Sequence, residues 1–187
     1  MIKPSVILVT GPMASGKNYI SSKMESDGWK SIDADILVHK VINEHAKEIY
    51  DTFKTPAREK NIDILLRGDE KNPVINRKAL GSLLFSNPLL LKKQEDIIYP
   101  EVIKLTKEFI RSNEKTIINA TVLYKTPELL NMCSKIIYVK SSFLKRLLRA
   151  KRRDKLPLKQ ILQRFYSQRH LFTEYSRFSI PIETINN

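Results

Sequence analysis

The chain has 187 residues, 42% of them hydrophobic, and a formal net charge of +13 at pH 7. This length suits one domain with a full core, and no segment approaches the ~20 consecutive apolar residues of a membrane span, so we expect no membrane association. The single cysteine, Cys133, excludes an internal disulfide and is typical of a reducing compartment. The N-terminus lacks a secretory signal pattern, so we expect a cytoplasmic protein.

An apolar run at 5–10 predicts the first strand, and it leads directly into a glycine-containing loop with the sequence Gly11-Pro12-Met13-Ala14-Ser15-Gly16-Lys17-Asn18. This loop follows the phosphate-binding pattern of two glycines and a lysine, except that Asn18 stands where the pattern has Ser or Thr. A helix is expected at 17–26. Backbone N–H groups at such a helix start, together with the Lys17 ammonium, attract the β- and γ-phosphates of a nucleotide. The loop therefore predicts nucleotide binding rather than an ordinary strand-to-helix turn.

A second short strand, expected at 29–32, leads into Asp33-Ala34-Asp35. A carboxylate at this strand end can accept the proton of a substrate hydroxyl that attacks a γ-phosphate, or it can help to hold Mg²⁺. Asp is also a frequent helix N-cap, and the spacing leaves both interpretations open.

The middle of the chain favours helices. A helix is expected at 34–53, and its buried stripe should contain Ile36, Leu37, Lys40, Val41 and Ile49. Residues 54–73 look less regular. Asn76 has the character of an N-cap for a helix with Leu80, Leu83 and Leu84 facing inward, and Arg77 beside it is either a solvated residue or a ligand for a substrate phosphate. Asn87-Pro88 should interrupt that helix, and separate helices are expected at 89–99 and, from Pro100, to about 112.

Three further strands are expected at 116–120, 135–139 and 180–185. Strands that alternate with helical stretches indicate an α/β fold with a parallel sheet. Ligands of such sheets bind beyond the carboxyl ends of the strands. We therefore expect the loop, Asp33 and the segment from Asn119 to Thr121 to meet at one edge.

The last third of the chain is strongly basic, with twelve Lys or Arg and two acidic residues between 140 and 178. Helices are expected at 142–153 and 158–175. A basic segment suits a polyphosphate, nucleic acid, a membrane surface or simply solvent. Arginine stabilises charge on a transferred phosphoryl group, so one of Arg146, Arg149, Arg152 and Arg153 is expected to act as a lid residue, although the pattern does not select which. We expect His39, His45 and His170 to occupy surface or filler positions. We expect Cys133 to be buried as a small hydrophobic side chain.

Taken together, these segments resemble the bacterial dephospho-CoA kinases from near Val6 to the last residues. Residues 28–35 correspond to the family's stretch ending in I-D-A-D, and residues 76–88 to its segment R-x-x-L-x-x-x-x-F-x-[DN]-P. Residues 144–146, with Arg153 and Asp154, resemble its lid, and Gln168 resembles a glutamine on the following helix. The order and spacing of these segments are far more specific than the phosphate loop alone.

The resemblance implies ATP-dependent phosphorylation of the ribose 3′-hydroxyl of dephospho-CoA to give CoA and ADP, the last step of CoA biosynthesis. It implies a single domain over residues 1–187. This domain would have a three-layer P-loop NTPase fold with a five-stranded parallel sheet of the nucleoside-monophosphate-kinase type. The core would span 1–60 and 112–187, a helical CoA-binding insertion about 61–111, and a lid about 140–157.

The resemblance also implies roles for individual residues. Asp33 matches the catalytic base, Lys17 the phosphate-binding lysine, and Arg146 a lid arginine that faces the transferred phosphoryl group. The ATP-binding set comprises Gly11, Pro12, Met13, Ala14, Ser15, Gly16, Lys17, Asn18, Arg146 and Arg153. The substrate-binding set comprises Asp33, Asp35, Arg77 and Tyr99. ATP and Mg²⁺ are the expected cofactors, with Asn18 as the metal ligand.

The departures from the family pattern lie at polar positions. Asn18 replaces the hydroxyl, Asn119 a strand-end Asp, Tyr99 a His, and Thr121 and Lys125 a Pro and a Glu. These changes predict a slow or unusual kinase. The alternatives are a catalytically impaired relative that acts by binding a nucleotide, or a kinase for another nucleotide-like substrate. A nucleic-acid module is not expected, because interleaved aromatics are lacking, and the sequence does not give the oligomeric state.

Overall fold

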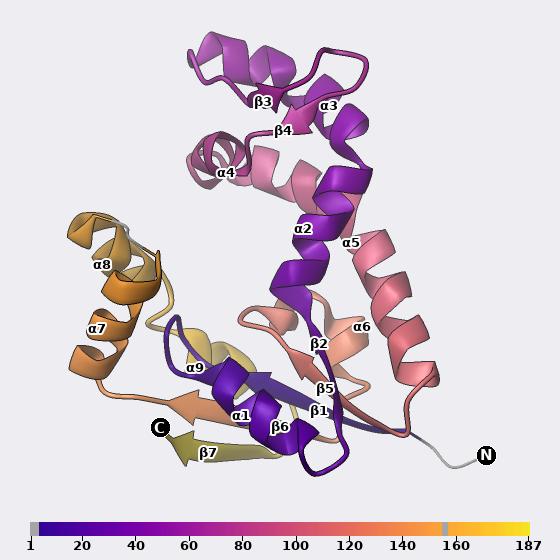
Figure 1. The fold of residues 1–187 in the computed structure, drawn as a ribbon, viewed down its shortest axis with the longest axis vertical. Coiled ribbons are helices and arrows are strands. Elements are labelled where there is room, and N and C mark those ends of the chain that lie inside the picture. Colours follow the sequence, from indigo (N-terminus) through magenta and orange to yellow (C-terminus); the bar gives the residue numbers. More distant parts are fainter. Residues whose placement is uncertain (1–3, 155–156) are drawn as a thin grey trace. The chain divides into compact units, whose positions relative to one another are not determined.

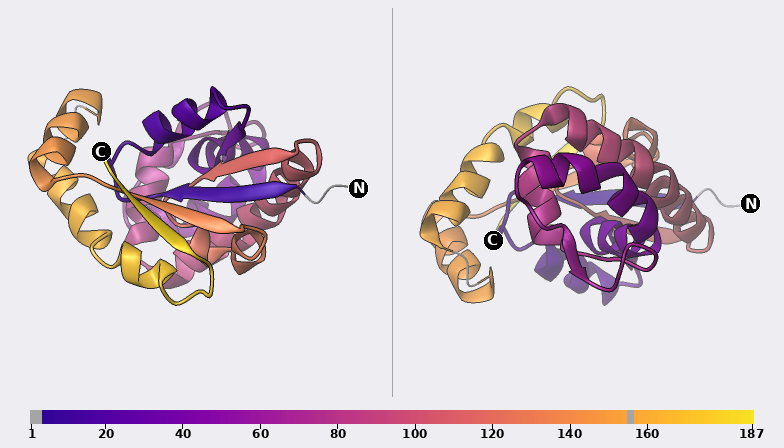
Figure 2. Two further views of the ribbon diagram at one scale, coloured as in Figure 1. Left: turned by 90° about the horizontal axis from the view of Figure 1, so that it is seen from below. Right: turned by 90° about the horizontal axis from the view of Figure 1, so that it is seen from above.

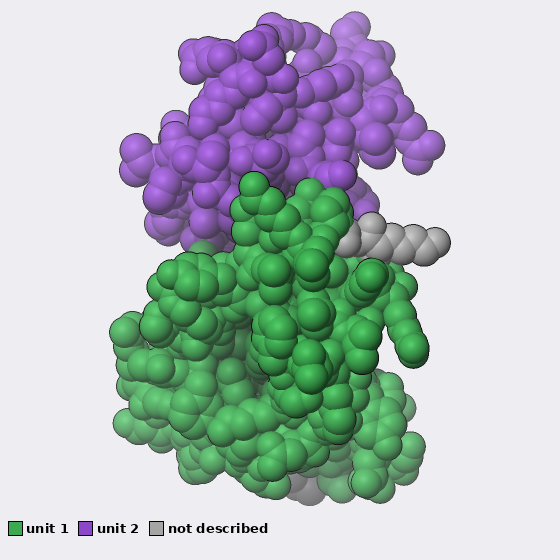
Figure 3. Space-filling view, turned by 90° about the vertical axis from the view of Figure 1, so that its left-hand side faces the viewer, with its two compact units in different colours: residues 1–35, 105–187 green, residues 36–104 purple. Residues whose placement is uncertain are grey.

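The computed structural model describes residues 4–154 and 157–187. The chain divides into two compact units, one formed by Met1–Asp35 with Leu105–Asn187 and the other by Ile36–Lys104 (Figure 3). We call them the sheet unit and the helical unit. The boundaries of the helical unit differ from the 61–111 expected for the CoA-binding insertion, and the substrate-binding role of that insertion stays a prediction.

A parallel five-stranded sheet organises the described part of the sheet unit (Figure 1). Its strands are β1 (Ser5–Thr10), β2 (Lys30–Asp33), β5 (Lys115–Asn119), β6 (Lys135–Lys140) and β7 (Ile182–Asn186). Their order across the sheet is β2-β5-β1-β6-β7, and every neighbouring pair is parallel. The left view of Figure 2 shows β1 between β5 and β6. Each expected strand is present within two residues of its expected bounds, and the predicted α/β fold with a five-stranded parallel sheet is confirmed.

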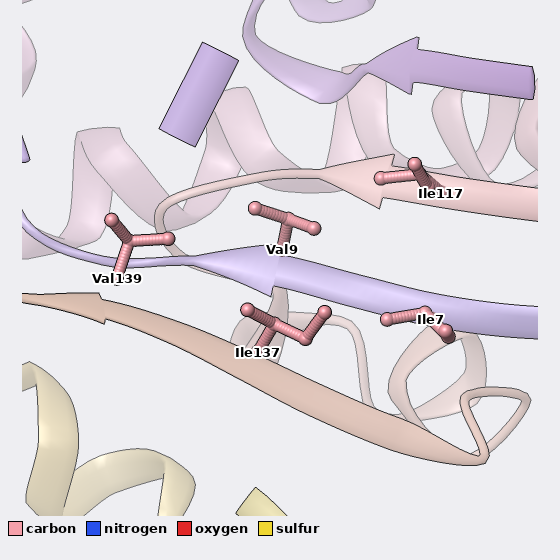
Figure 4. Close-up of a cluster of buried hydrophobic side chains, with 5 residues drawn as sticks. All are labelled: Ile7, Val9, Ile117, Ile137 and Val139. Carbon is pink, nitrogen blue, oxygen red and sulfur yellow. The ribbon is translucent and has the colours of Figure 1, made fainter. Parts of the chain in front are cut away.

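Buried aliphatic side chains on the three central strands form the centre of the sheet unit. Figure 4 shows this cluster, which comprises Ile7, Val9, Ile117, Ile137 and Val139. Because side chains alternate between the two faces of a strand, these residues share one face of the sheet. Ile20 and Met24 of α1 (Lys17–Glu25) pack on that face.

The opposite face of the sheet also carries a helix. Tyr138 lies between Ile137 and Val139 and therefore points to the other face, where its ring meets the ring of Phe172 on α9 (Leu171–Tyr175) at 5.0 Å. On the same helix, Tyr175 is buried and its hydroxyl donates to the backbone oxygen of Thr121 at 3.0 Å. Helices therefore cover both faces, which makes the three layers that the resemblance implied.

The remaining helices of the sheet unit are short or basic. They are η1 (Leu123–Lys125), α6 (Pro127–Leu130), α7 (Phe143–Asp154) and α8 (Leu158–Ser167). The prediction of one helix at 158–175 is wrong, because this segment forms two helices, α8 and α9. They are separated at Gln168, the C-cap of α8, whose side chain accepts a hydrogen bond from the backbone N–H of Met13. The expected lid at about 140–157 includes residues 155 and 156, which lie outside the described residues.

The helical unit begins within α2 (Ala34–Glu44) and ends within α5 (Pro88–Arg111). Between them lie α3 (Ala46–Glu59), β3 (Leu65–Arg67), β4 (Val74–Ile75) and α4 (Arg77–Phe85). The prediction for α4 is confirmed, because Asn76 Oδ1 accepts a hydrogen bond from the backbone N–H of Ala79 and the three expected leucines are buried.

Other expectations for the middle of the chain are wrong. The helix expected at 34–53 is two helices, and Ile36 and Lys40 of its expected buried stripe are exposed, while Leu37, Val41 and Ile49 are buried. The stretch expected to be irregular, 54–73, contains the end of α3 and the strand β3, which pairs antiparallel with β4 directly after the stretch. Two buried isoleucines, Ile64 and Ile75, anchor this pair, which is too short to show an alternating pattern.

Pro100 lies inside α5 instead of opening a new helix. Gln94, Ile98 and Val102 are all buried, and their spacing of four residues places them on one helix face that continues across the proline. Tertiary packing of this face therefore outweighs the hydrogen bond that proline removes.

The minor expectations are confirmed. Burial raises the pKa of the Cys133 thiol to about 12, as expected for a small buried side chain. His39 and His170 are exposed and His45 is half-buried. Within the described residues, none of the helices has the length and apolar character to cross a membrane.

Candidate active site

The loop between β1 and α1, residues 11–16, takes a shape that requires glycine at both ends. A Cβ on Gly11 would lie 2.4 Å from the backbone oxygen of Val139 on β6. Gly16, the N-cap of α1, has a φ of 102°, and Ala14 within the loop has a φ of 61°. Residues of alternating backbone hand form the kind of N–H concavity that binds anions. The observed strand, loop and helix are therefore the context that a phosphate-binding loop needs.

Lys17 lies along the loop rather than in solvent. Its Nζ donates to the backbone oxygen of Gly11 at 3.0 Å. Burial lowers the pKa of the Lys17 ammonium, the carboxylates of Asp35 and Asp33 oppose that shift, and the guanidinium of Arg153 adds to it. Lys17 is thus a partly desolvated cation, and its charge interacts with both carboxylates at the end of β2.

Asp33 is the last residue of β2 and lies level with Asn119 of β5 in the register of the sheet. Its Oδ1 accepts a hydrogen bond from the backbone N–H of Asp35 at 2.9 Å, in the first turn of α2. Asp33 therefore supports the start of a helix and also acts on the charge of Lys17. The two interpretations that the sequence left open are compatible with each other.

The second polar residue at this edge is Asn119, whose Nδ2 donates to Oδ1 of Asn18 at 3.0 Å. Asn119 is buried at the end of β5, and Asn18 is exposed in the first turn of α1. The positions that hold a hydroxyl and a carboxylate in the family pattern are here joined as a neutral pair of amides. We call Asn18 and Asn119 the amide pair.

Residues distant in sequence also form hydrogen bonds with the backbone of the loop. The Met13 N–H donates to Oε1 of Gln168 at 2.6 Å, and the Met13 oxygen accepts from Nε of Arg146 at 2.9 Å. The Ser15 oxygen accepts from Nη1 of Arg149 at 3.3 Å and from Nδ2 of Asn187 at 2.9 Å. These bonds connect the loop to α7, to the end of α8 and to the residue after β7.

Arg146 is half-buried. Its guanidinium lies over the ring of Phe165 at 4.0 Å, and burial lowers its pKa. The resemblance implies that this arginine faces the transferred phosphoryl group. In the structure it bonds the loop backbone, and its phosphate-facing role stays a prediction.

A cavity of about 510 Å³ lies against the loop, with a lining of Ala14, Gly16, Lys17, Asn18, Arg149, Arg152 and Arg153. Among the described residues that line it, four are cationic and none is acidic. Arg153 forms a forked pair with Asp154 through bonds of 2.7 and 3.2 Å, which raises the pKa of Arg153. The cavity is therefore an electropositive space next to the helix N-terminus, suited to a polyphosphate.

Two residues of the expected substrate-binding set belong to the helical unit. Arg77 is exposed at the first position of α4, and Tyr99 is half-buried on α5. Their contribution to substrate binding stays a prediction.

Sequence reasoning missed one residue of the site and left others undecided. Asn187 was not identified, because a lone Asn after a strand has no distinguishing pattern. Gln168 was marked only through the family resemblance, and Arg149 belonged to a set of four equivalent arginines. Hydrogen bonds to the loop backbone distinguish Arg146 and Arg149 from Arg152 and Arg153.

Comparisons with known proteins identify relatives of this chain. A family model described as dephospho-CoA kinase matches residues 5–180. A dephospho-CoA kinase from Treponema denticola is 36% identical over 189 residues, which cover 98% of this chain and 81% of that protein. The dephospho-CoA kinase from Treponema pallidum is 29% identical, over 97% of this chain and 86% of its own.

Two solved structures share the fold. The structure of TT1252 from Thermus thermophilus superimposes with a TM-score of 0.76 at 23% identity, over 98% of this chain and 88% of that chain. Dephospho-CoA kinase from Campylobacter jejuni superimposes with a TM-score of 0.59 at 25% identity, over 99% of this chain and 89% of that chain. The sheet and its flanking helices are therefore those of known structures, including one named as a kinase.

Proposed function

This chain belongs to the dephospho-CoA kinase family, and from that membership we propose that it transfers the γ-phosphoryl group of ATP to the ribose 3′-hydroxyl of dephospho-CoA. One observation carries the proposal beyond the family name. Lys17, on the phosphate loop, interacts electrostatically with Asp33 and Asp35 at the end of β2. Asn119 bonds Asn18, the residue after Lys17, and lies level with Asp33 in the sheet, so a phosphate-binding cation and a candidate base lie at the same edge of the sheet. We take this small-molecule kinase to act in the cytoplasm.

The loop and the cavity would bind the triphosphate. Backbone N–H groups at the start of α1 and the Lys17 ammonium suit the β- and γ-phosphates. Arg149 and Arg153 line the same cavity and would balance further negative charge. Positioning and charge stabilisation are the main contributions that a protein makes to phosphoryl transfer.

Asp33 would act as the general base. The 3′-hydroxyl oxygen attacks the γ-phosphorus, the bond from that phosphorus to the bridging oxygen of ADP breaks, and the hydroxyl proton passes to the Asp33 carboxylate. The hydrogen bond from the Asp35 N–H to Asp33 Oδ1 orients this carboxylate. Asp35 would contribute to substrate binding beside it.

Mg²⁺ is the ion expected to accompany ATP, but the amide pair does not match a site built from a hydroxyl and a carboxylate. The Oδ1 of Asn18 accepts a hydrogen bond from Asn119, and the pair carries no charge. In the described part of the chain, no group of three or more His, Cys, Asp or Glu residues is placed to hold a metal ion. The assignment of Asn18 as a metal ligand is therefore not part of the proposal.

We propose that Arg77 and Tyr99 contact dephospho-CoA and that the segment around α7, about 140–157, forms the lid. Substitution of Arg77 by Ala should raise the KM for dephospho-CoA and leave the KM for ATP unchanged.

The test of the proposal is CoA formation from ATP and dephospho-CoA by the purified protein. Asp33→Asn should reduce the rate by about 10²–10⁴-fold, because it removes the base. Asn is also a good N-cap, so the helix start, and with it the unfolding temperature, should be retained. Asp27→Asn, at an exposed position after α1, is the matched control and should leave the rate unchanged.

Two outcomes would contradict the proposal. If Asp33→Asn keeps the wild-type rate, Asp33 is not the base. If the wild-type protein forms no CoA, the substrate is wrong, and ATP consumption with other nucleotide-like acceptors should then be measured.

A further inference from the structure

The amide pair occupies the two positions at which a phosphate loop and its neighbouring strand usually hold Mg²⁺. In that arrangement the hydroxyl after the loop lysine bonds the ion, and a strand-end carboxylate supports it. Here Asn18 follows Lys17, and Asn119 is the last residue of β5. The two positions are therefore the same, but neutral amides replace the hydroxyl and the carboxylate.

The change in chemistry disfavours a magnesium ion in two ways. First, replacing a carboxylate by an amide removes a full negative charge next to a divalent cation, and Mg²⁺ favours carboxylate, phosphate and water oxygens in strict octahedral geometry. Second, a hydroxyl donates its proton to a carboxylate and keeps its lone pairs for the metal. Asn18 instead accepts a hydrogen bond on Oδ1, the atom that would have to bond the ion.

Positive charge on the protein can balance a triphosphate without a metal ion. Lys17, Arg149, Arg152 and Arg153 line the cavity beside the loop, and Arg153 among them is paired with Asp154. Arg149 is held in place by bonds to the Ser15 oxygen at 3.3 Å and to the Ser141 hydroxyl at 3.4 Å. Guanidinium groups remain charged at all accessible pH values, so this balance is present before any metal or nucleotide binds.

We propose that this phosphate loop binds ATP with little dependence on Mg²⁺, because the amide pair does not ligate the ion and the arginines of the cavity neutralise the triphosphate. The inference rests on the proposed function in taking ATP as the ligand, and it is independent of dephospho-CoA. Neither Asn18 nor Asn119 would be a ligand of an Mg²⁺ ion that enters with the nucleotide.

The test compares ATP binding by the full chain in excess Mg²⁺ and in EDTA, at matched ionic strength, by isothermal titration calorimetry. The two dissociation constants of the wild-type protein should agree within about threefold. The double variant N18T/N119D restores the hydroxyl–carboxylate pair, and it should bind ATP at least about tenfold more tightly with Mg²⁺ than without it. Asn131→Asp adds the same charge at an exposed position after α6 and should keep the wild-type ratio.

The outcomes separate this inference from the proposed function. A wild-type affinity that falls about tenfold or more in EDTA would overturn the inference whether or not CoA is formed, even if the double variant does not fold. Magnesium-insensitive ATP binding without CoA formation would support the inference and overturn the proposed function. If ATP does not bind in either condition, both are wrong.

Discussion

Two groups of side chains border the phosphate loop. Two neutral amides, from α1 and β5, bond to each other, whereas guanidinium groups from α7 bond to carbonyl oxygens of the loop itself. We call the second group, Arg146 and Arg149 with Asn187, the clamp. The amide pair changes the chemistry expected for a metal, whereas the clamp fixes the shape of the backbone. Different side chains therefore control metal chemistry and backbone shape at one short loop.

Two arginines from the basic last third of the chain support the phosphate loop. Arg146 and Arg149 are three residues apart on α7, so they lie on the same helix face and both reach the loop. A movement of α7 must break their bonds to the loop. The position of the expected lid and the shape of the phosphate site are therefore coupled.

The largest expected effect on the clamp comes from a methyl group at Gly16. A Cβ there would lie 1.8 Å from Nδ2 of Asn187, so it displaces that side chain from Ser15, and the φ of 102° is strained for any residue with a Cβ. The strain costs about 1–2 kcal/mol and the lost hydrogen bond about 1 kcal/mol. Gly16→Ala should therefore weaken ATP binding by about 100-fold, measured by calorimetry.

A double-mutant cycle separates the two contributions of Gly16. Asn187→Ala alone should weaken ATP binding by about fivefold, through the lost bond to Ser15. Added to Gly16→Ala it should cost nothing more, because the bond is already broken. Additive losses would show that Asn187 acts independently of the loop.

The clamp is tested next at Arg149. Arg149→Ala should weaken ATP binding by about tenfold, because it removes bonds to the loop as well as a charge. Arg152 is the matched control, since it lines the same cavity from the same helix. Arg152→Ala should cost less and should lose its effect at high salt. Equal losses at high salt in both variants would contradict a structural role for the bonds of Arg149.

The smallest expected effect is a dependence on pH at Lys17. Burial lowers its pKa from the ordinary value of 10.5, and a bound triphosphate raises it again. ATP binding should therefore take up protons, and its affinity should fall severalfold as the pH rises toward about 10. Calorimetry at about pH 9 in two buffers of different ionisation enthalpy measures the uptake. Lys17→Arg should abolish it, because arginine stays protonated; an unchanged uptake would assign the proton to another group.

Residue patterns along the chain are enough to predict the contiguous parts of the site. The strand, the loop from Gly11 to Gly16 and the helix after it form one local motif, whose glycines and apolar run are visible without any partner. The strand that ends at Asp33 is likewise visible as a local pattern. The burial of Cys133 is predicted from its residue type alone. Local patterns of this kind reflect backbone geometry and burial, which act between near neighbours.

The tertiary structure alone decided which distant side chains complete the site. It brought Arg146 and Arg149, out of four similar arginines, to the loop, brought Asn187 to Ser15, and joined Asn119 to Asn18 across 101 positions of sequence. It also kept Pro100 inside a helix, because a buried face continues on both sides of it. A hydrogen bond between remote residues depends on how whole elements pack, and periodicity along the chain carries no record of that packing.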